Sequence, residues 1–177
     1  AGQSHRQADG HRPDSDGKLN NYLVHAGMQL AENWELRYVL NRTDNRAVDP
    51  GPETGSGLPQ TRGDVYLTEN WLNIVTAAWD YERAEGWVKA YSNEGKGDWL
   101  RRATSGNADA FNDYKLSGVR WREVLRLWEG SEITGGMDYD LMEGTSVSVQ
   151  PGAAPQRKFG PEKFRLASAY VGWNHTW

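Results

Sequence analysis

The side chains best suited to bind a ligand are arginines and tryptophans in or beside the long polar stretches of the sequence. A guanidinium presents a planar fork of donors that matches carboxylates and phosphates, and an indole presents a flat face to planar molecules. Ordinary surface charge on loops is the competing interpretation for each of them. The candidates for contact with an anionic or planar ligand are Arg42, Arg62, Trp99, Arg101 and Arg102.

A second group of charged residues lies on either side of Gly130. A hairpin centred on that glycine pairs residue numbers that sum to 260, which sets Arg122 opposite Asp138 and Arg120 opposite Asp140. Residues directly opposite each other in an antiparallel pair lie on the same face of the sheet. The spacing therefore predicts two ion pairs on one face, with a structural role in the wall of a barrel lumen.

No grouping of residues in the sequence predicts catalysis or a bound metal. Asp44 and Asp49 are possible Ca²⁺ ligands, but they lack a recognisable ligand spacing, so a solvated loop is the favoured interpretation. We therefore expect no enzyme activity, no metal site and no cofactor. The histidines lie far apart in the chain, and none has a partner at helical i, i+4 spacing: His5, His11, His25 and His175.

Composition narrows the classes of protein to which the chain can belong. Only 37% of its 177 residues are hydrophobic, and the mean hydropathy is −0.81. No window approaches the ~20 consecutive apolar residues of a spanning helix, which excludes a helical membrane protein but leaves a transmembrane β-barrel open. The net charge of −4, with mixed signs, predicts no nucleic-acid partner. The chain begins with Ala1 and shows no leader, so we expect it to be processed or to be a piece of a longer protein.

The stretch YLVHAGMQLAENWELRYVL, residues 22–40, alternates between apolar and polar residues almost without error. A period of two is typical of β-strands that have one apolar and one polar face. Only Ala31-Glu32-Asn33 interrupts the alternation, which indicates two strands joined by a tight turn. The apolar face of such a hairpin packs either against a protein core or against lipid.

The whole chain divides into about seven such strands after a polar beginning. Residues 1–17 are predicted to be a flexible loop or the end of a fragment, and residues 18–177 a single β-rich segment. Short turns and long connections alternate strictly between the strands. The predicted strands span about 19–30, 34–43, 65–82, 87–94, 113–128, 132–143 and 164–175.

Strand length and loop length favour a membrane barrel over a soluble sheet. A tilted strand needs ~9–11 residues to cross a bilayer, which the predicted strands reach, whereas strands of soluble proteins average ~5–6. Outer-membrane barrels alternate short periplasmic turns with long extracellular loops. Aromatic residues near the short turns fit an interfacial girdle, and cross-strand packing in a soluble sheet is the competing interpretation. They are Trp34, Trp79, Tyr81, Trp87 and Trp128.

We therefore predict an all-β fold: an antiparallel up-and-down transmembrane β-barrel segment that is incomplete by itself. Glu123 falls on the lipid face in this arrangement, so it requires a bulge, a position near the interface or a different register. Trp128 is turned toward the lumen, which is a smaller misfit. The pattern leaves open which face of the strands at 65–82, 87–94 and 164–175 is outward.

Three runs carry a resemblance to a known family: NWELRYVLNRTDNRAVDPG, WDYERAEGWVKAYSNEGKGDWL and SGVRWREVLRLWEGSEITGGMDYDLMEG. Together they resemble the barrel of TonB-dependent outer-membrane receptors over about residues 18–175. The resemblance implies a 22-stranded barrel closed by an N-terminal plug, located in the bacterial outer membrane. It also implies import of a scarce nutrient such as a ferric siderophore, haem or cobalamin, with energy delivered by a TonB-type transducer through the plug.

The sequence departs from that family in its extent. It has about seven strands, no plug domain before them and no candidate TonB box. The expected partners are therefore outer-membrane lipid and the remaining barrel strands and plug, supplied by a longer chain or by a second polypeptide. Two other functions stay open: a passive outer-membrane porin or structural barrel, and a soluble β-sandwich that binds carbohydrate.

Overall fold

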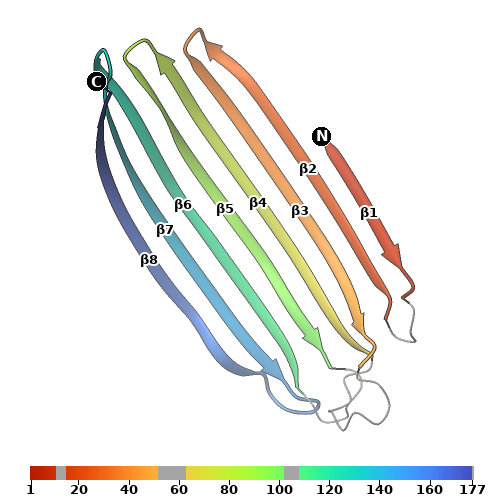
Figure 1. Ribbon diagram of the computed structural model, residues 1–177. Helices are drawn as coiled ribbons and strands as arrows, with labels where there is room; N and C mark the ends of the chain where they lie inside the picture. The colour runs from red at the N-terminus through yellow and green to blue at the C-terminus, as the bar shows by residue number, and fades with distance from the viewer. Residues whose placement is uncertain (11–14, 52–62, 102–107, 177) are drawn as a thin grey trace.

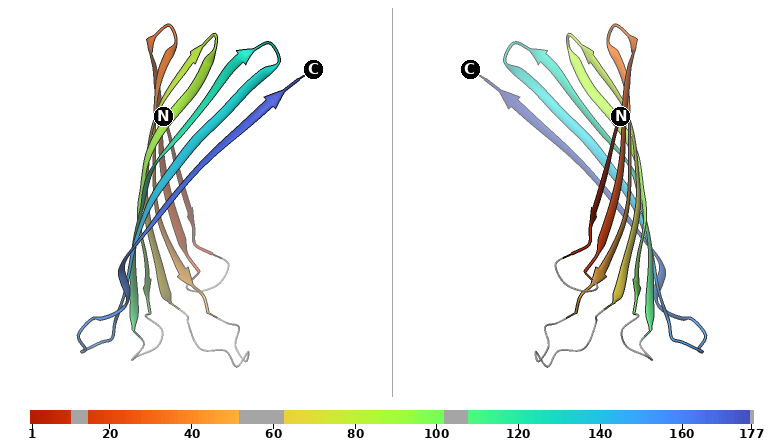
Figure 2. Two further views of the ribbon diagram at one scale, coloured as in Figure 1. Left: turned by 90° about the vertical axis from the view of Figure 1, so that its left-hand side faces the viewer. Right: turned by 90° about the vertical axis from the view of Figure 1, so that its right-hand side faces the viewer.

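The computed structural model describes residues 1–10, 15–51, 63–101 and 108–176. Within them the chain forms one antiparallel sheet of eight strands, in which each strand pairs with its neighbours in sequence (Figure 1). No helix in this part of the chain has the length and apolar character that crossing a membrane would require. Figure 2 shows the sheet as a single twisted layer. The predicted all-β, up-and-down antiparallel order is thus confirmed.

The strands are long, and two-residue turns at 32–33, 82–83 and 129–130 join three of the hairpins. Gly130 has a φ of 73°, a conformation that glycine adopts without steric cost. All three turns lie at one end of the sheet, and the strand ends that lead into the longer connections lie at the other (Figure 1). The strands are β1 (Gly2–Ala8), β2 (Gly17–Ala31), β3 (Trp34–Asp49), β4 (Asp64–Tyr81), β5 (Ala84–Leu100), β6 (Asp109–Trp128), β7 (Ser131–Val149) and β8 (Gln156–His175).

The structure adds to the predicted strands in two ways. Residues 2–8, predicted as part of a flexible loop, form β1 against the first half of β2, which makes eight strands rather than seven. The strands also continue further from the short turns than predicted, so that the last long connection shrinks to residues 150–155. These polar stretches become strands because their backbone pairs with that of the neighbouring strand. Their side chains do not alternate between apolar and polar, so the sequence pattern did not predict them as strands.

The hairpin of β6 and β7 has a different register from the predicted one. Arg120 lies opposite Asp138 and Arg122 lies opposite Gly136, a shift of two residues. Because side chains alternate with a period of two, a shift of two keeps the residues as far as Arg126 on their predicted faces. The predicted cross-strand partners are wrong, because Arg122 does not lie opposite Asp138 and Arg120 does not lie opposite Asp140.

The register divides the side chains into an apolar face and a polar face of one sheet. A row across seven strands on the apolar face contains only apolar residues, and the adjacent row on the polar face contains only glycine and polar residues. The cross-strand partners thereby settle the faces that the sequence left open. The apolar row is Met28, Leu36, Ala77, Val88, Trp121, Met137 and Ala169; the polar row is Gly27, Arg37, Thr76, Lys89, Arg120, Asp138 and Ser168.

The sheet has almost no core of its own. Val124 is the one buried hydrophobic side chain among the described residues. The chain of 19.9 kDa exposes 12007 Å², whereas a compact monomer of that mass exposes about 8,700 Å². Met28, Met137 and Trp173 on the apolar face are 56%, 56% and 66% exposed. Burial of this face must therefore come from something outside the described residues.

Candidate ligand-binding site

Two of the predicted ligand-contacting residues meet at the ends of β4 and β5 that lie far from the short turns. The guanidinium carbon of Arg101 lies 3.9 Å from the ring centroid of Trp99. Trp99 also stacks on Tyr66, its direct cross-strand partner, at 5.5 Å between centroids and 19° between planes. We call Tyr66, Trp99 and Arg101 the aromatic–arginine cluster.

Carboxylates hold the aromatic–arginine cluster in place. The indole N–H of Trp99 donates to Oδ2 of Asp64 at 3.0 Å, and Asp64 is only 2% exposed. The backbone N–H of Arg101 donates to Oδ1 of Asp109 at 2.8 Å, which ties the start of the β5–β6 connection to β6. Burial first, and then the charges of Asp49 and Asp64, raise the pKa of Tyr66, while Arg101 opposes the shift. The tyrosine therefore stays a neutral hydrogen-bonding group.

This arrangement can stack a flat molecule and attract a negative charge. The cluster places a cation over an aromatic ring, and the planar guanidinium retains donors for a carboxylate or phosphate. Nε of Arg101 is buried and has no hydrogen-bond partner among the described residues. The cluster thus has the chemistry predicted for an anionic or planar ligand.

The other predicted contact residues do not join the cluster. Arg42 lies on the apolar face of β3, opposite in direction to Trp99. There its guanidinium lies 4.5 Å from the ring of Trp71 and pairs with Asp44 at 3.1 Å and Glu69 at 3.6 Å. Arg42 therefore does not belong to the same cluster as Trp99, because its even position in β3 turns it to the opposite face. Arg62 and Arg102 lie outside the described residues.

The four charged residues of the β6–β7 hairpin lie on the polar face as predicted, but Arg120 takes both aspartates. Its guanidinium lies 4.0 Å from Asp138 and 3.8 Å from Asp140. The hydroxyl of Tyr91 on β5 donates to Asp140, and Arg120 lies 5.4 Å from the Tyr91 ring. Arg122 makes no ion pair within the described part of the chain. The result is one network across three strands rather than two separate pairs.

Sequence reasoning missed the residues that neighbouring strands contribute. Asp64 and Tyr66 join Trp99 only because Val65 pairs with Leu100, which the sequence did not specify. Tyr91 joins Arg120 through the pairing of Tyr91 with Gly118. The sequence offered one signal for the second case: Tyr91 and Gly118 lie at similar distances from their short turns, as expected of an aromatic residue opposite a glycine. That signal can be used only when the register of the two strands is known.

Glu123 lies on the apolar face, as the sequence predicted. Its Oε1 accepts the indole N–H of Trp79 at 3.2 Å, so the carboxylate has a partner there. It sits in the row of Trp34, Trp79 and Gly86, close to the short turns. A position near the interface was one of the three explanations given above for a carboxylate on this face.

The predicted aromatic residues near the short turns do not all share one face. Trp34 stacks on Trp79 at 5.1 Å between centroids and donates to the hydroxyl of Tyr81 at 2.7 Å, all on the apolar face. Trp87 lies on the polar face, opposite Arg122. A register irregularity between Arg126 and Trp128 sets Trp128 opposite Ser131, which brings it to the apolar side. The prediction that Trp128 is turned toward the lumen is therefore wrong.

The apolar face changes character at one row of residues. In this row, where the apolar stretch ends, positive and negative side chains alternate from strand to strand and form ion pairs. Nζ of Lys115 lies 2.5 Å from Glu94, and Nζ of Lys163 lies 2.8 Å from Glu143. The hydrogen bond from Lys115 lowers the pKa of Glu94 and raises that of Lys115. We call this the boundary row; it consists of Tyr22, Arg42, Trp71, Glu94, Lys115, Glu143 and Lys163.

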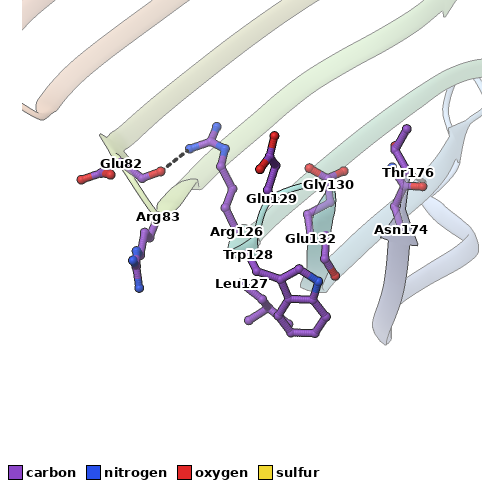
Figure 3. Close-up of a pocket in the computed structure, with 11 residues that line it drawn as sticks. Glu82, Arg83, Arg126, Leu127, Trp128, Glu129, Gly130, Glu132, Asn174 and Thr176 are labelled. Atoms are coloured by element: carbon purple, nitrogen blue, oxygen red, sulfur yellow. Dashed lines mark hydrogen bonds between the residues drawn. The ribbon is translucent and has the colours of Figure 1, made fainter.

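A hollow of about 420 Å³ lies at the opposite end, between two short turns (Figure 3). Arg126 crosses it and donates to the backbone carbonyls of Tyr81 and Glu82 at 3.2 and 3.4 Å. It also pairs with Glu85. Leu127 and Trp128 project side by side, as expected of a bulge (Figure 3). Because Arg126 is already bonded to the backbone of the β4–β5 turn and to Glu85, it joins two hairpins, and the hollow is a weaker ligand site than the aromatic–arginine cluster.

Asp64→Ala is expected to lower the free energy of unfolding by about 1–2 kcal/mol, because the indole N–H of Trp99 loses its buried acceptor. Thermal unfolding in detergent, followed by near-ultraviolet circular dichroism, measures the loss. Asp80→Ala is the matched control: its side chain is 79% exposed, so its loss is expected to stay below about 0.5 kcal/mol. Equal losses in the two variants contradict the role of Asp64.

Comparison of the chain with models of protein families, with curated proteins and with solved structures finds no match. Among the described residues, no three histidine or carboxylate side chains are grouped so as to hold a metal ion. Asp44 and Asp49, the possible calcium ligands, belong to β3 and point to opposite faces.

Proposed function

We propose that this chain is part of the barrel wall of a bacterial outer-membrane receptor of the TonB-dependent type, which imports a scarce nutrient such as a ferric siderophore, haem or cobalamin. The observation that carries the proposal is the exposed apolar face of a single-layer sheet. On β2 this face is apolar from Tyr22 to Leu30, and on β7 it is apolar or glycine from Ile133 to Leu141. Nine residues on each strand match the ~9–11 that a tilted strand needs to cross a bilayer.

The stagger of the hairpins supports the same proposal. Trp34 lies opposite Trp79, and β4 continues two residues further, to Tyr81. Ala84 lies opposite Leu125, and β6 continues three residues further, to Trp128. One of these residues is bulged, so the stagger across the four spacings from β3 to β7 is four ladder positions. At ~3.3 Å per residue and ~4.8 Å per strand, it corresponds to a strand tilt of about 35°. Strands of closed barrels tilt by about 35–45°.

The free edges of the sheet support the expectation of further strands. Neither β8 nor the half of β2 beyond Leu23 has a second partner strand among the described residues. Unpaired backbone groups in a bilayer cost several kcal/mol each. In this proposal the missing strands, a plug and the TonB-type transducer that acts on it belong to a longer chain or to a second polypeptide.

In the proposed mechanism the polar face lines the lumen and the aromatic–arginine cluster lies at its external mouth. A planar or anionic ligand stacks against Tyr66 and Trp99, while Arg101 meets its negative charge. The Arg120–Asp140–Tyr91 network lies deeper and stiffens the wall. Binding and release involve no covalent step.

The detergent requirement of the purified chain tests the proposal. We expect the chain to leave membranes only with detergent and to carry further β-rich polypeptide with it, because the apolar face needs lipid and the edges need strands. Size-exclusion chromatography with light scattering, in detergent and in plain buffer, measures both. A monodisperse particle of about 20 kDa in plain buffer overturns the membrane assignment. A detergent-dependent particle with an open lumen and no plug favours the porin alternative.

A further inference from the structure

We propose that the apolar face carries a binding site for the phosphate of a lipid headgroup, formed on β8 by Lys163 and Arg165, which we call the β8 basic cluster. The inference rests on the proposed function, because it assumes that this face meets a bilayer. It concerns the outward surface, whereas the aromatic–arginine cluster lies on the opposite face.

The β8 basic cluster begins where the apolar stretch of β8 ends. From the short-turn end, the apolar face of β8 carries Trp173, Val171, Ala169 and Ala167 and then Arg165. Cations at the edge of an apolar surface lie at the level of lipid headgroups, where anionic lipids attract lysine and arginine. The cluster is thus at the depth at which a headgroup phosphate meets protein.

Charge distinguishes this part of the boundary from the rest. On β3 and β6, Arg42 pairs with Asp44 and Glu69, and Lys115 pairs with Glu94. On β8 only Lys163 has a carboxylate, that of Glu143, within the described part of the chain.

The arginine of the cluster faces an apolar partner. Arg165 lies opposite Leu141 and makes no ion pair within the described residues. Two neighbouring cations therefore share one carboxylate, and the excess positive charge suits an anionic phosphate. Arginine binds phosphate through two parallel hydrogen bonds, which a neutral or zwitterionic headgroup satisfies less well.

The full chain in detergent micelles, titrated with short-chain phosphatidic acid or short-chain phosphatidylcholine and observed by native mass spectrometry, tests the site. We expect phosphatidic acid to bind in preference to phosphatidylcholine. The double variant Lys163→Gln/Arg165→Gln is expected to bind phosphatidic acid about thirty-fold more weakly, since each surface cation contributes to attraction of an anionic lipid. Glu143→Gln is expected to bind it more tightly, because the competing carboxylate is gone.

The matched control is Lys89→Gln/Arg122→Gln, which removes the same charges from the polar face and is expected to leave lipid binding unchanged. Equal affinity of the β8 double variant and this control overturns the inference, as does equal binding of the two lipids. Displacement of phosphatidic acid by an equal concentration of inorganic phosphate also overturns it, because the site then recognises free phosphate. Solubility without detergent removes the proposed function itself, whereas detergent dependence without lipid preference removes only this inference.

Discussion

In the proposed membrane barrel, Ala26→Arg is expected to reduce the stability of the sheet by about 2–4 kcal/mol. Ala26 is the middle residue of the apolar stretch Tyr22–Leu30 on β2, and its side chain is exposed. At this depth in the proposed bilayer, no water reaches a guanidinium. The residue opposite Ala26 is Tyr38, which has no carboxylate to pair with it. Urea-dependent folding of the assembly in phospholipid vesicles, followed by tryptophan fluorescence, measures the change.

His25→Arg is the matched control for this experiment. His25 is the adjacent residue on the polar face, opposite Val39, so the same cation is introduced at the same depth but on the other side of the sheet. Its expected effect is below about 1 kcal/mol, because lumen positions are solvated. If the two variants lose the same stability, the two faces meet similar surroundings and the assignment of lipid to the apolar face fails.

The expected difference in stability between the Ala26 and His25 variants depends on the face that each residue occupies, and the sequence predicted these faces well. Alternation between Tyr22 and Leu40 identified two strands, their turn and the face of each residue, and the structure agrees. One register error of two residues in the β6–β7 hairpin left the faces correct as far as Arg126, and the bulge beyond it turned Trp128 to the other face. Period and turn position are local properties, so a single sequence contains them.

Pairing between strands is not a local property, and the wrong predictions arise there. β4 has Leu72, Ile74 and Ala78 on its polar face, so the sequence of β4 alone does not show which face is polar. The face is identified by Thr76, which lies opposite Arg37 on β3 and Lys89 on β5. β1 has no alternation at all and forms through its backbone pairing with β2.

The candidate site depended on both kinds of information. Trp99 and Arg101 were predicted from residue type alone, and only two positions separate them in sequence. Tyr66 and Asp64 come from another strand, so the register was needed to find them. Arg42 was also chosen from residue type, which does not show that its side chain lies on the apolar face.

Glycines under aromatic rings are a second feature that only the pairing reveals. Tyr91 lies over Gly118, Tyr114 over Gly95, and Tyr170 over Gly136; each pair is formed by direct cross-strand partners on the polar face. An aromatic ring that covers a glycine shields backbone that has no side chain of its own and fixes the register of the two strands. The ordered lumen surface of this proposal therefore depends on the glycines as much as on the tyrosines.

Gly118→Ala is accordingly expected to lower the free energy of unfolding by about 2–3 kcal/mol. A Cβ at this position would lie 2.5 Å from the carbonyl oxygen of Tyr139, 2.6 Å from Oδ1 of Asp140 and 2.8 Å from the hydroxyl of Tyr91. Because one of these atoms belongs to the backbone, rotation of a side chain does not relieve the contact. The hydrogen bond from Tyr91 to Asp140 is expected to be lost as well, which Tyr91→Phe in the same background tests by adding no further loss.

Gly172→Ala supplies the comparison. Gly172 also lies on the polar face, opposite Thr134, but a Cβ added there would have no described atom within 4 Å, so alanine is expected to be neutral or slightly stabilising. Urea titration of both variants in the same vesicles separates steric contact from strand flexibility. If Gly118→Ala is as stable as Gly172→Ala, the ring of Tyr91 does not rest on Gly118, and the network that joins it to Arg120 and Asp140 is not a fixed part of the wall.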